Sequence, residues 1–168
     1  MLMLDIGCGD TLRDGYLGVD VRPLPHVGIV CAAWEIGQHV AAGTVARIYS
    51  RHMLEHLPAA RAAQALAAWR TALQPGGALE ILVPDLTYHA RQLLDEPDAP
   101  SAWNPRHSNR QHAIRSLYGW QAAEWDLHRW GYTDETLTAA LQTAGFIQIT
   151  RVPDDPWHLH LTAITRAD

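Results

Sequence analysis

The sequence predicts an α/β fold, a mostly parallel sheet of seven strands with helices on both faces and an antiparallel β-hairpin at its end. Short apolar runs alternate with segments of helical periodicity along most of the chain. The run at residues 78–83 is apolar almost throughout, as in strands that are buried on both faces. The turn at residues 153–156 is too short for a crossover helix, so the last two strands should pair antiparallel.

The first part of the chain supplies four strands joined by loops. They are expected at residues 1–6, 16–21, 27–31 and 45–50. Residues 4–20 read Leu-Asp-Ile-Gly-Cys-Gly-Asp-Thr-Leu-Arg-Asp-Gly-Tyr-Leu-Gly-Val-Asp, which is a strand, a glycine loop and a second strand that ends in an acid. Only eight residues separate Gly7 from Tyr16, whereas a crossover helix needs about a dozen. Residues 10–15 should therefore form a turn and no full helix.

The second part alternates helices with the remaining strands. Pro58 suits the start of a helix over residues 59–73, which the run Gln74–Gly77 should stop. The buried face of this helix is expected to hold Ala62, Leu66, Trp69 and Leu73. Further helices are expected at residues 85–94, 106–117 and 133–144, with Thr133 as an N-cap, and further strands at 78–83, 146–152 and 158–165.

Composition narrows the class of protein. The length of 168 residues suits one domain over 1–168. A net charge of -5, no lysine and no basic stripe argue against nucleic acid as the main partner. No apolar run approaches the roughly 18 residues of a membrane span. Residues 1–5 lack the basic start of a secretory signal and Cys8 and Cys31 suit reduced thiols, so a cytoplasmic location is expected.

The glycine loop and the acid at the end of the second strand predict a nucleoside pocket. Glycines let the backbone approach a ligand closely, since no Cβ intervenes. Asp20 stands where an acid can accept hydrogen bonds from a ribose diol. A nicotinamide cofactor of an oxidoreductase would also suit such a pocket, but the third glycine of Gly-x-Gly-x-x-Gly is replaced by Leu12.

Five motifs, in order, resemble those of class I S-adenosylmethionine-dependent methyltransferases, which have a Rossmann-like sheet. The motifs are Asp5–Gly9, Asp20, Ser50–His56, Pro75–Gly77 with Val83–Asp85, and His128–Thr133. The likeness is greatest to a small bacterial branch whose members are often predicted to act on sugars in surface-polysaccharide assembly. The resemblance implies methyl transfer to a small-molecule or sugar acceptor, at oxygen.

The resemblance also implies where S-adenosyl-L-methionine binds. Gly7, Cys8 and Gly9 would lie against its methionine and ribose, and Asp20 would accept its ribose hydroxyls. Asp5 would support the loop or the methionine amine. No acid follows the third strand, so backbone groups and stacking on Trp34 would hold the adenine. The floor near the sulfonium is assigned to Ser50, Arg51 and His52.

Residues 97–132 are interpreted as a lid or a substrate-binding insertion, because many relatives have helices before their first strand. A partner chain in a homodimer could also supply the lid. The segment is rich in histidine and aromatic residues, which suit a sugar or an aromatic acceptor. Substrate contacts are assigned to His89, His112, Tyr118 and Tyr132. The base for a hydroxyl acceptor is assigned to His128, with Asp85 as an orienting group or alternative base and also as a helix N-cap.

No metal site is predicted. His52 and His56 have the spacing of two helical ligands, but His-Met-Leu-Glu-His is not His-Glu-x-x-His, so Glu55 and His56 are expected to form structural hydrogen bonds. His158 and His160 face the same side of a strand and are expected to be exposed on an edge hairpin. Besides the enzyme, the sequence leaves open a non-catalytic cofactor-binding partner or regulator of another methyltransferase.

Overall fold

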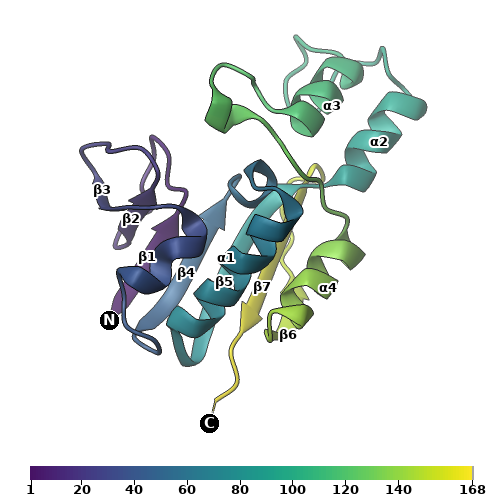
Figure 1. Ribbon diagram of the computed structural model, residues 1–168. Coiled ribbons are helices and arrows are strands. Elements are labelled where there is room, and N and C mark those ends of the chain that lie inside the picture. The colour runs from purple at the N-terminus through teal and green to yellow at the C-terminus, as the bar shows by residue number, and fades with distance from the viewer. Residues whose placement is uncertain (168) are drawn as a thin grey trace.

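The computed structural model describes residues 1–167, and within them one seven-stranded sheet has the order β3-β2-β1-β4-β5-β7-β6 (Figure 1). The strands are β1 (Leu2–Ile6), β2 (Leu17–Asp20), β3 (Val27–Val30), β4 (Val45–Arg51), β5 (Leu73–Pro84), β6 (Ile147–Arg151) and β7 (His158–Ile164). Strands β1 to β5 are parallel, and β7 runs antiparallel between β5 and β6. The predicted mostly parallel sheet with a terminal antiparallel hairpin is confirmed.

The helices are α1 (Ala59–Ala72), α2 (Leu86–Leu94), α3 (Asn109–Tyr118) and α4 (Asp134–Thr143), with 3₁₀ turns η1 (Ala33–Gln38), η2 (Leu54–His56) and η3 (Glu124–Asp126). Side chains cap three of them as capping preferences predict. Thr133 accepts a hydrogen bond from the backbone of Thr136, Ser108 accepts one from Gln111, and Asp85 accepts from Thr87 and Tyr88. The predicted cap at Thr133 is therefore confirmed.

The helices that pack on the sheet share one face of it. In Figure 1, η1, α1 and α4 lie in front of the sheet, while α2 and α3 lie beyond the carboxyl ends of the parallel strands. The hydrophobic core agrees, because it joins Ile36 of η1, Trp69 of α1 and Leu137 of α4 to strand residues such as Leu4 and Ile81. The expected helices on both faces are not confirmed.

The other face of the sheet is polar where β1, β4 and β5 run side by side. Arg13 forms a 3.0 Å ion pair with Glu80 and lies 4.1 Å above the ring of Tyr49. The connections β1–β2 and β2–β3 are short loops over residues 7–16 and 21–26. Connections of this length are too short for crossover helices, which accounts for the missing layer.

The turn predicted at residues 10–15 is confirmed. The amide of Thr11 donates to Cys8 O at 3.2 Å, and that of Tyr16 donates to Arg13 O at 3.1 Å. Gly15 has φ +78°, a left-handed conformation that favours glycine. The amide of Arg13 donates to the buried Asp5 carboxylate at 2.9 Å. Asp5 therefore supports the loop, one of the two roles expected for it.

The boundary between α1 and β5 differs from the prediction. The helix ends at Ala72, and β5 begins at Leu73 instead of Ala78. Leu73 pairs with Val45 and Ala78 pairs with Arg47, so the residues between them bulge out of the ladder. Leu73 is buried as expected, but on a strand, because the Pro-Gly-Gly segment bends within the strand instead of preceding it. None of the helices in the described chain combines the length and apolar character that crossing a bilayer requires.

Candidate functional site

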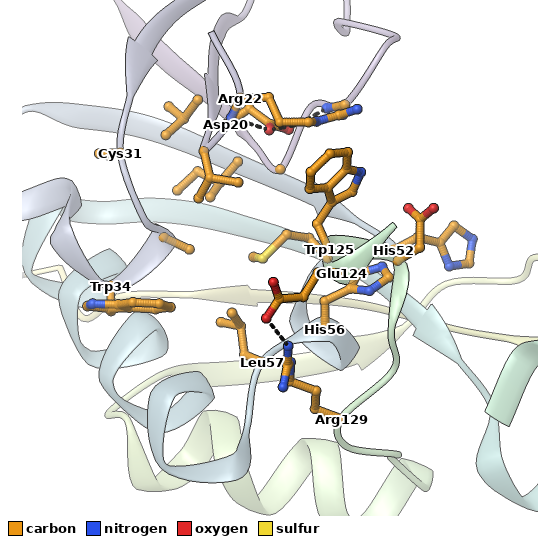
Figure 2. A pocket seen from close by; sticks show the side chains of 18 residues that line it. Asp20, Arg22, Cys31, Trp34, His52, His56, Leu57, Glu124, Trp125 and Arg129 are labelled. Atoms are coloured by element: carbon orange, nitrogen blue, oxygen red, sulfur yellow. Dashed lines mark hydrogen bonds and ion pairs between the residues drawn. The ribbon is translucent and has the colours of Figure 1, made fainter. Parts of the chain in front are cut away.

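A cavity of about 420 Å³ opens at the carboxyl ends of β1 and β2 and is called here the loop cavity (Figure 2). Figure 2 shows Trp34 on one side of it, His52 and His56 on the other, and Asp20 with Arg22 along a third. In open α/β sheets ligands bind at this edge, where the strand order reverses. The order β2-β1-β4 places the reversal next to the glycine loop.

The glycine loop is held by hydrogen bonds to β2. Gly7 has φ +76°, and its amide donates to Val19 O at 2.7 Å. A Cβ on Gly7 would collide with the side chain of Met53. Gly9 has φ +57°, and its amide donates to Asp20 Oδ2 at 2.9 Å. The loop therefore requires glycine at residues 7 and 9, which both line the loop cavity.

Asp20 is buried in the wall of the loop cavity, with 7% of its surface exposed. Its Oδ1 accepts hydrogen bonds from the backbone amide of Arg22 at 2.9 Å and from Arg22 Nε at 3.2 Å. The guanidinium of Arg22 compensates the buried charge and lies 5.9 Å from the ring of Trp125. Each carboxylate oxygen has lone pairs beyond these contacts, so Asp20 can also accept hydrogen bonds from a ligand.

The rim of the loop cavity comes from the segment expected to form a lid. Glu124, Trp125 and Asp126 of η3 line the cavity together with Arg129. Glu124 and Arg129 form an ion pair at 3.7 Å, which Figure 2 shows below Trp125. Part of the segment predicted to be a lid or a substrate-binding insertion thus lies against the glycine-loop side.

A second cavity of about 340 Å³ lies beside the first and is called here the histidine cavity. Its lining includes six histidines, namely His52, His56, His89, His112, His128 and His158. Trp103, Trp120 and Trp157 add flat apolar surface to it, and Arg115 adds a positive charge. His52, His56 and Asp126 line both cavities, so the two cavities meet at a common wall.

Two of these histidines belong to a buried hydrogen-bond network between α2 and α3. His89 Nδ1 donates to Gln92 Oε1 at 2.9 Å, and the Gln92 amide donates to His112 Nδ1 at 3.2 Å. Ser101 Oγ lies 2.9 Å from the same nitrogen of His112. Burial, with the charges of neighbouring histidines, lowers the pKa of His112 to about 4. Burial likewise lowers the pKa of His89, so both rings are neutral near pH 7.

Glu55 lies beneath the common wall, with 1% of its surface exposed. Its Oε1 accepts a hydrogen bond from His52 Nδ1 at 3.2 Å and lies 4.0 Å from His128 Nε2. Burial favours the neutral acid, but the His52 hydrogen bond and the positive potential of His52, His56 and His128 outweigh it and hold the pKa of Glu55 below its usual value. The backbone amides of Arg129 and Trp130 donate to Glu55 O at 2.8 and 3.1 Å and bind the end of the lid segment to η2.

The structure brings together some of the residues assigned to the cofactor. Gly7, Gly9, Asp20, Trp34 and His52 line the loop cavity. Asp5, Cys8 and Arg51 border a neighbouring cavity of about 400 Å³, which shares Gly7 and His52 with the loop cavity. Ser50 is buried, and its Oγ donates to Ile6 O at 3.0 Å, which ties β4 to β1. Burial and the charges of Asp5 and Asp20 raise the pKa of the Cys8 thiol to about 11, so Cys8 is a neutral thiol.

The residues assigned to the acceptor also separate into two groups. His89, His112 and His128 line the histidine cavity. Tyr132 is 4% exposed and lies in the hydrophobic core, whereas Tyr118 is 59% exposed. Asp85 caps α2, forms a 3.4 Å ion pair with Arg151 and borders another cavity. The geometry thus gathers the histidines and leaves Asp85, Tyr118 and Tyr132 apart from them.

The prediction that His158 and His160 are exposed on an edge hairpin is wrong for both residues. His158 is 8% exposed because β7 lies inside the sheet, between β5 and β6. Sequence reasoning also missed Trp157, Trp103 and Arg22. The predicted antiparallel hairpin could have indicated Trp157 and His158. A strand that runs antiparallel to the rest of the sheet begins at the edge where the parallel strands end. The first residues of β7 therefore lie at the carboxyl edge, beside Pro84 of β5.

Solved methyltransferase structures share the fold. A SAM-dependent methyltransferase from Archaeoglobus fulgidus has a TM-score of 0.63 and 14% identity, over 97% of this chain and 85% of that chain. A 1,6-didemethyltoxoflavin-N1-methyltransferase from Burkholderia thailandensis, with bound S-adenosylhomocysteine, has a TM-score of 0.61 and 19% identity, over 98% and 71% of the two chains. A protein from Bordetella parapertussis, described as a possible exported protein, has a TM-score of 0.64 and 16% identity and covers 99% of this chain.

The chain spans 62% of the length of the Bordetella parapertussis protein. No protein-family model and no curated protein sequence matches the chain. The likeness is therefore one of structure, and it agrees with the observed strand order and the antiparallel β7. The chain has the Rossmann-like fold of class I S-adenosylmethionine-dependent methyltransferases.

Proposed function

We propose that the protein transfers a methyl group from S-adenosyl-L-methionine to a hydroxyl of a small-molecule acceptor, with a sugar as the expected class. The observation that carries the proposal is the common wall, where His52, His56 and Asp126 line both cavities. A cofactor in the loop cavity and an acceptor in the histidine cavity would meet there. Methyl transfer is an in-line displacement, so holding the two reactants together is the main catalytic task.

The loop cavity has the groups that the cofactor needs. Gly7 and Gly9 would leave room for its methionine and ribose, and Asp20 would accept the ribose hydroxyls. Trp34 would stack on the adenine, in place of the acid that is missing after β3. η3 would cover the cofactor as part of a lid within residues 97–132, since its residues line the rim.

The histidine cavity suits a polar acceptor with flat faces. Trp103, Trp120 and Trp157 offer surfaces that pack on sugar rings, and the neutral histidines can donate to or accept from hydroxyls. The resemblance to a branch whose members are often predicted to act on sugars in surface-polysaccharide assembly supports the same class. His128 would take the acceptor proton, because its Nδ1 donates to Ser116 O at 2.7 Å and leaves a lone pair on Nε2.

The test is a transfer assay with S-adenosyl-L-methionine labelled in its methyl group and a panel of monosaccharides and nucleotide sugars. We expect label in one acceptor class and release of S-adenosylhomocysteine. The variant His128→Gln should bind S-adenosylhomocysteine as the parent does and should lose most turnover. Tight binding of S-adenosylhomocysteine without transfer to any acceptor would favour a non-catalytic partner or regulator instead. Binding of NAD alone would favour an oxidoreductase.

A further inference from the structure

We propose that Glu55, His56 and His128 form a binding site for a divalent transition-metal ion of the zinc type. One ligand atom from each residue lies within 4.8 Å of the others. Two imidazoles and a carboxylate are a donor set that zinc uses in catalytic sites, where a further position stays open. His56 and His128 both line the histidine cavity, so an ion held between them would border that cavity.

Both histidines are fixed in the tautomer that a metal ion requires. His56 Nδ1 lies 3.1 Å from Leu127 O, and His128 Nδ1 lies 2.7 Å from Ser116 O. A carbonyl oxygen only accepts, so each Nδ1 carries the proton and each Nε2 carries a lone pair. Metal-binding histidines usually donate their second N–H to a carbonyl or carboxylate in this way. The rings stand edge to face, with centroids 4.7 Å apart.

Glu55 has a buried carboxylate oxygen that is free to bind an ion. Its Oε2 is buried and has no hydrogen-bond partner among the described residues, while Oε1 is bonded to His52. Proteins rarely leave a buried carboxylate oxygen without a hydrogen-bond partner, because removing it from water is unfavourable. The carboxylate of Glu55 would be the anionic ligand of the site. A bound cation would satisfy Oε2 and neutralise the charge.

The two halves of the cluster are held together without an ion. The amides of Arg129 and Trp130 donate to Glu55 O, which fixes the segment after His128 against η2. His128 Nε2 and Glu55 Oε1 are 4.0 Å apart. Ligands at about 2.1 Å from a tetrahedral ion lie about 3.4 Å from one another. Binding therefore needs His128 Nε2 and Glu55 Oε1 to approach by roughly half an ångström, and a pair of ligand atoms as far apart as 4.8 Å to approach by more.

The role of the ion rests on the proposed function, whereas the site itself does not. An acceptor hydroxyl bound to the ion would have a lowered pKa and would release its proton to water in the histidine cavity. His128 would then act as a ligand and not as the base, since one lone pair cannot serve both purposes. The metal titration below needs no methyl transfer, and binding of S-adenosylhomocysteine is measured separately, so failure of one proposal is distinguishable from failure of the other.

The test is titration of the EDTA-treated full chain with Co²⁺, followed by visible absorption, and then displacement of the Co²⁺ by Zn²⁺. We expect about one equivalent of Co²⁺ with a spectrum of four- or five-coordinate cobalt. His56→Ala, His128→Gln and Glu55→Gln should each weaken binding roughly tenfold or more. Circular dichroism establishes that each variant is folded. If His56→Ala does not fold, His56→Gln is used in its place.

Two control variants make the assignment specific. His39→Ala removes an exposed histidine at the end of η1 and should bind Co²⁺ as the parent does. Asp155→Asn alters a second group, Asp154, Asp155 and His158, whose ligand atoms also lie within 4.8 Å of one another, and it should likewise bind normally. The proposal is overturned if the parent binds well below one equivalent, or if Asp155→Asn loses the ion while folded His56→Ala keeps it.

Discussion

His52 and His158 face each other through their Nε2 atoms at 3.1 Å, although they are 106 residues apart in the sequence. His52 directly follows β4 in a left-handed conformation with φ +49°, and His158 begins β7. One of the two nitrogens must donate, because two lone pairs would repel at this distance. His52 also contacts Glu55, so this pair joins the hairpin at the end of the chain to the common wall of the two cavities.

Replacing Gly7 by alanine should abolish cofactor binding. The residue has φ +76°, and a Cβ there would collide with Met53, so the loop must move away from the cavity. The left-handed conformation alone costs roughly 1–2 kcal/mol for a residue with a Cβ. Calorimetric titration with S-adenosylhomocysteine should show no binding to Gly7→Ala. Gly37→Ala is the matched control, because a Cβ at Gly37 would meet nothing within 4 Å. Equal affinity of Gly7→Ala and Gly37→Ala would contradict the loop's role.

Removing the buried hydrogen bond of Ser50 should affect stability and not the ligand. Ser50 is 1% exposed, and its Oγ donates to Ile6 O at 3.0 Å. In Ser50→Ala the carbonyl of Ile6 loses this partner, so the free energy of unfolding should fall by about 1–3 kcal/mol. Urea denaturation measures the change. If the affinity for S-adenosylhomocysteine fell tenfold while stability stayed the same, Ser50 would belong to the pocket floor as the resemblance implies.

Stability should fall with acid because of His112. Its pKa is about 4 in the folded protein against 6.5 when exposed, so the unfolded chain binds more protons between these two values. The contribution of His112 to the free energy of unfolding is therefore fully present above pH 6.5 and decreases as the pH falls towards 4. The pKa difference corresponds to about 3 kcal/mol for this group.

Thermal unfolding of the parent and of His112→Gln across that range isolates the contribution of His112. Other buried histidines act in the same direction, so the expected result is a shallower pH dependence in the variant. His39→Gln, at an exposed site, should follow the parent. Parallel curves for the parent and His112→Gln would show that His112 is not buried as a neutral ring.

A substitution in the histidine cavity should affect binding of the acceptor and not binding of the cofactor. Trp103 lies nearly parallel to His112, with ring centroids 5.2 Å apart, and lines the histidine cavity but not the loop cavity. Trp103→Ala should leave the affinity for S-adenosylhomocysteine unchanged and should raise the KM of the acceptor found in the transfer assay. Trp130→Ala, half exposed and outside both cavities, is the control. A fall in S-adenosylhomocysteine affinity in Trp103→Ala would contradict this division.

Local patterns in the sequence were enough to predict most of the elements. The alternation of apolar runs and helical segments, the cap at Thr133 and the short turn after the glycine loop depend on neighbouring residues, and the structure confirms them. The position of β5 was less predictable, since Leu73 fits the face of a helix and the edge of a sheet equally well. The missing helical layer follows from two short connections, residues 7–16 and 21–26, and only the first of them bears on the turn predicted from the sequence.

The site was harder to predict because its contacts are long-range. Asp20 and the glycines belong to one continuous motif, so their shared cavity could be expected. The histidine cavity combines residues from the ends of β4 and β7, from α2 and α3, and from the lid segment. No local pattern indicates that His158 meets His52. Tyr132 belongs to the same motif as His128, but its ring packs in the core while His128 lines the cavity.

The central claim is that the loop cavity binds the nucleoside of S-adenosyl-L-methionine through Asp20. Calorimetric titration of the purified protein with S-adenosylhomocysteine tests it most directly, with Asp20→Asn beside the parent. Asp10→Asn is the control, because Asp10 contacts the same Arg22 at 3.5 Å but is exposed. We expect one-to-one binding to the parent and to Asp10→Asn, with affinity at least about tenfold weaker in Asp20→Asn. No binding to the parent at high micromolar concentration, or equal binding to Asp20→Asn, would contradict the account.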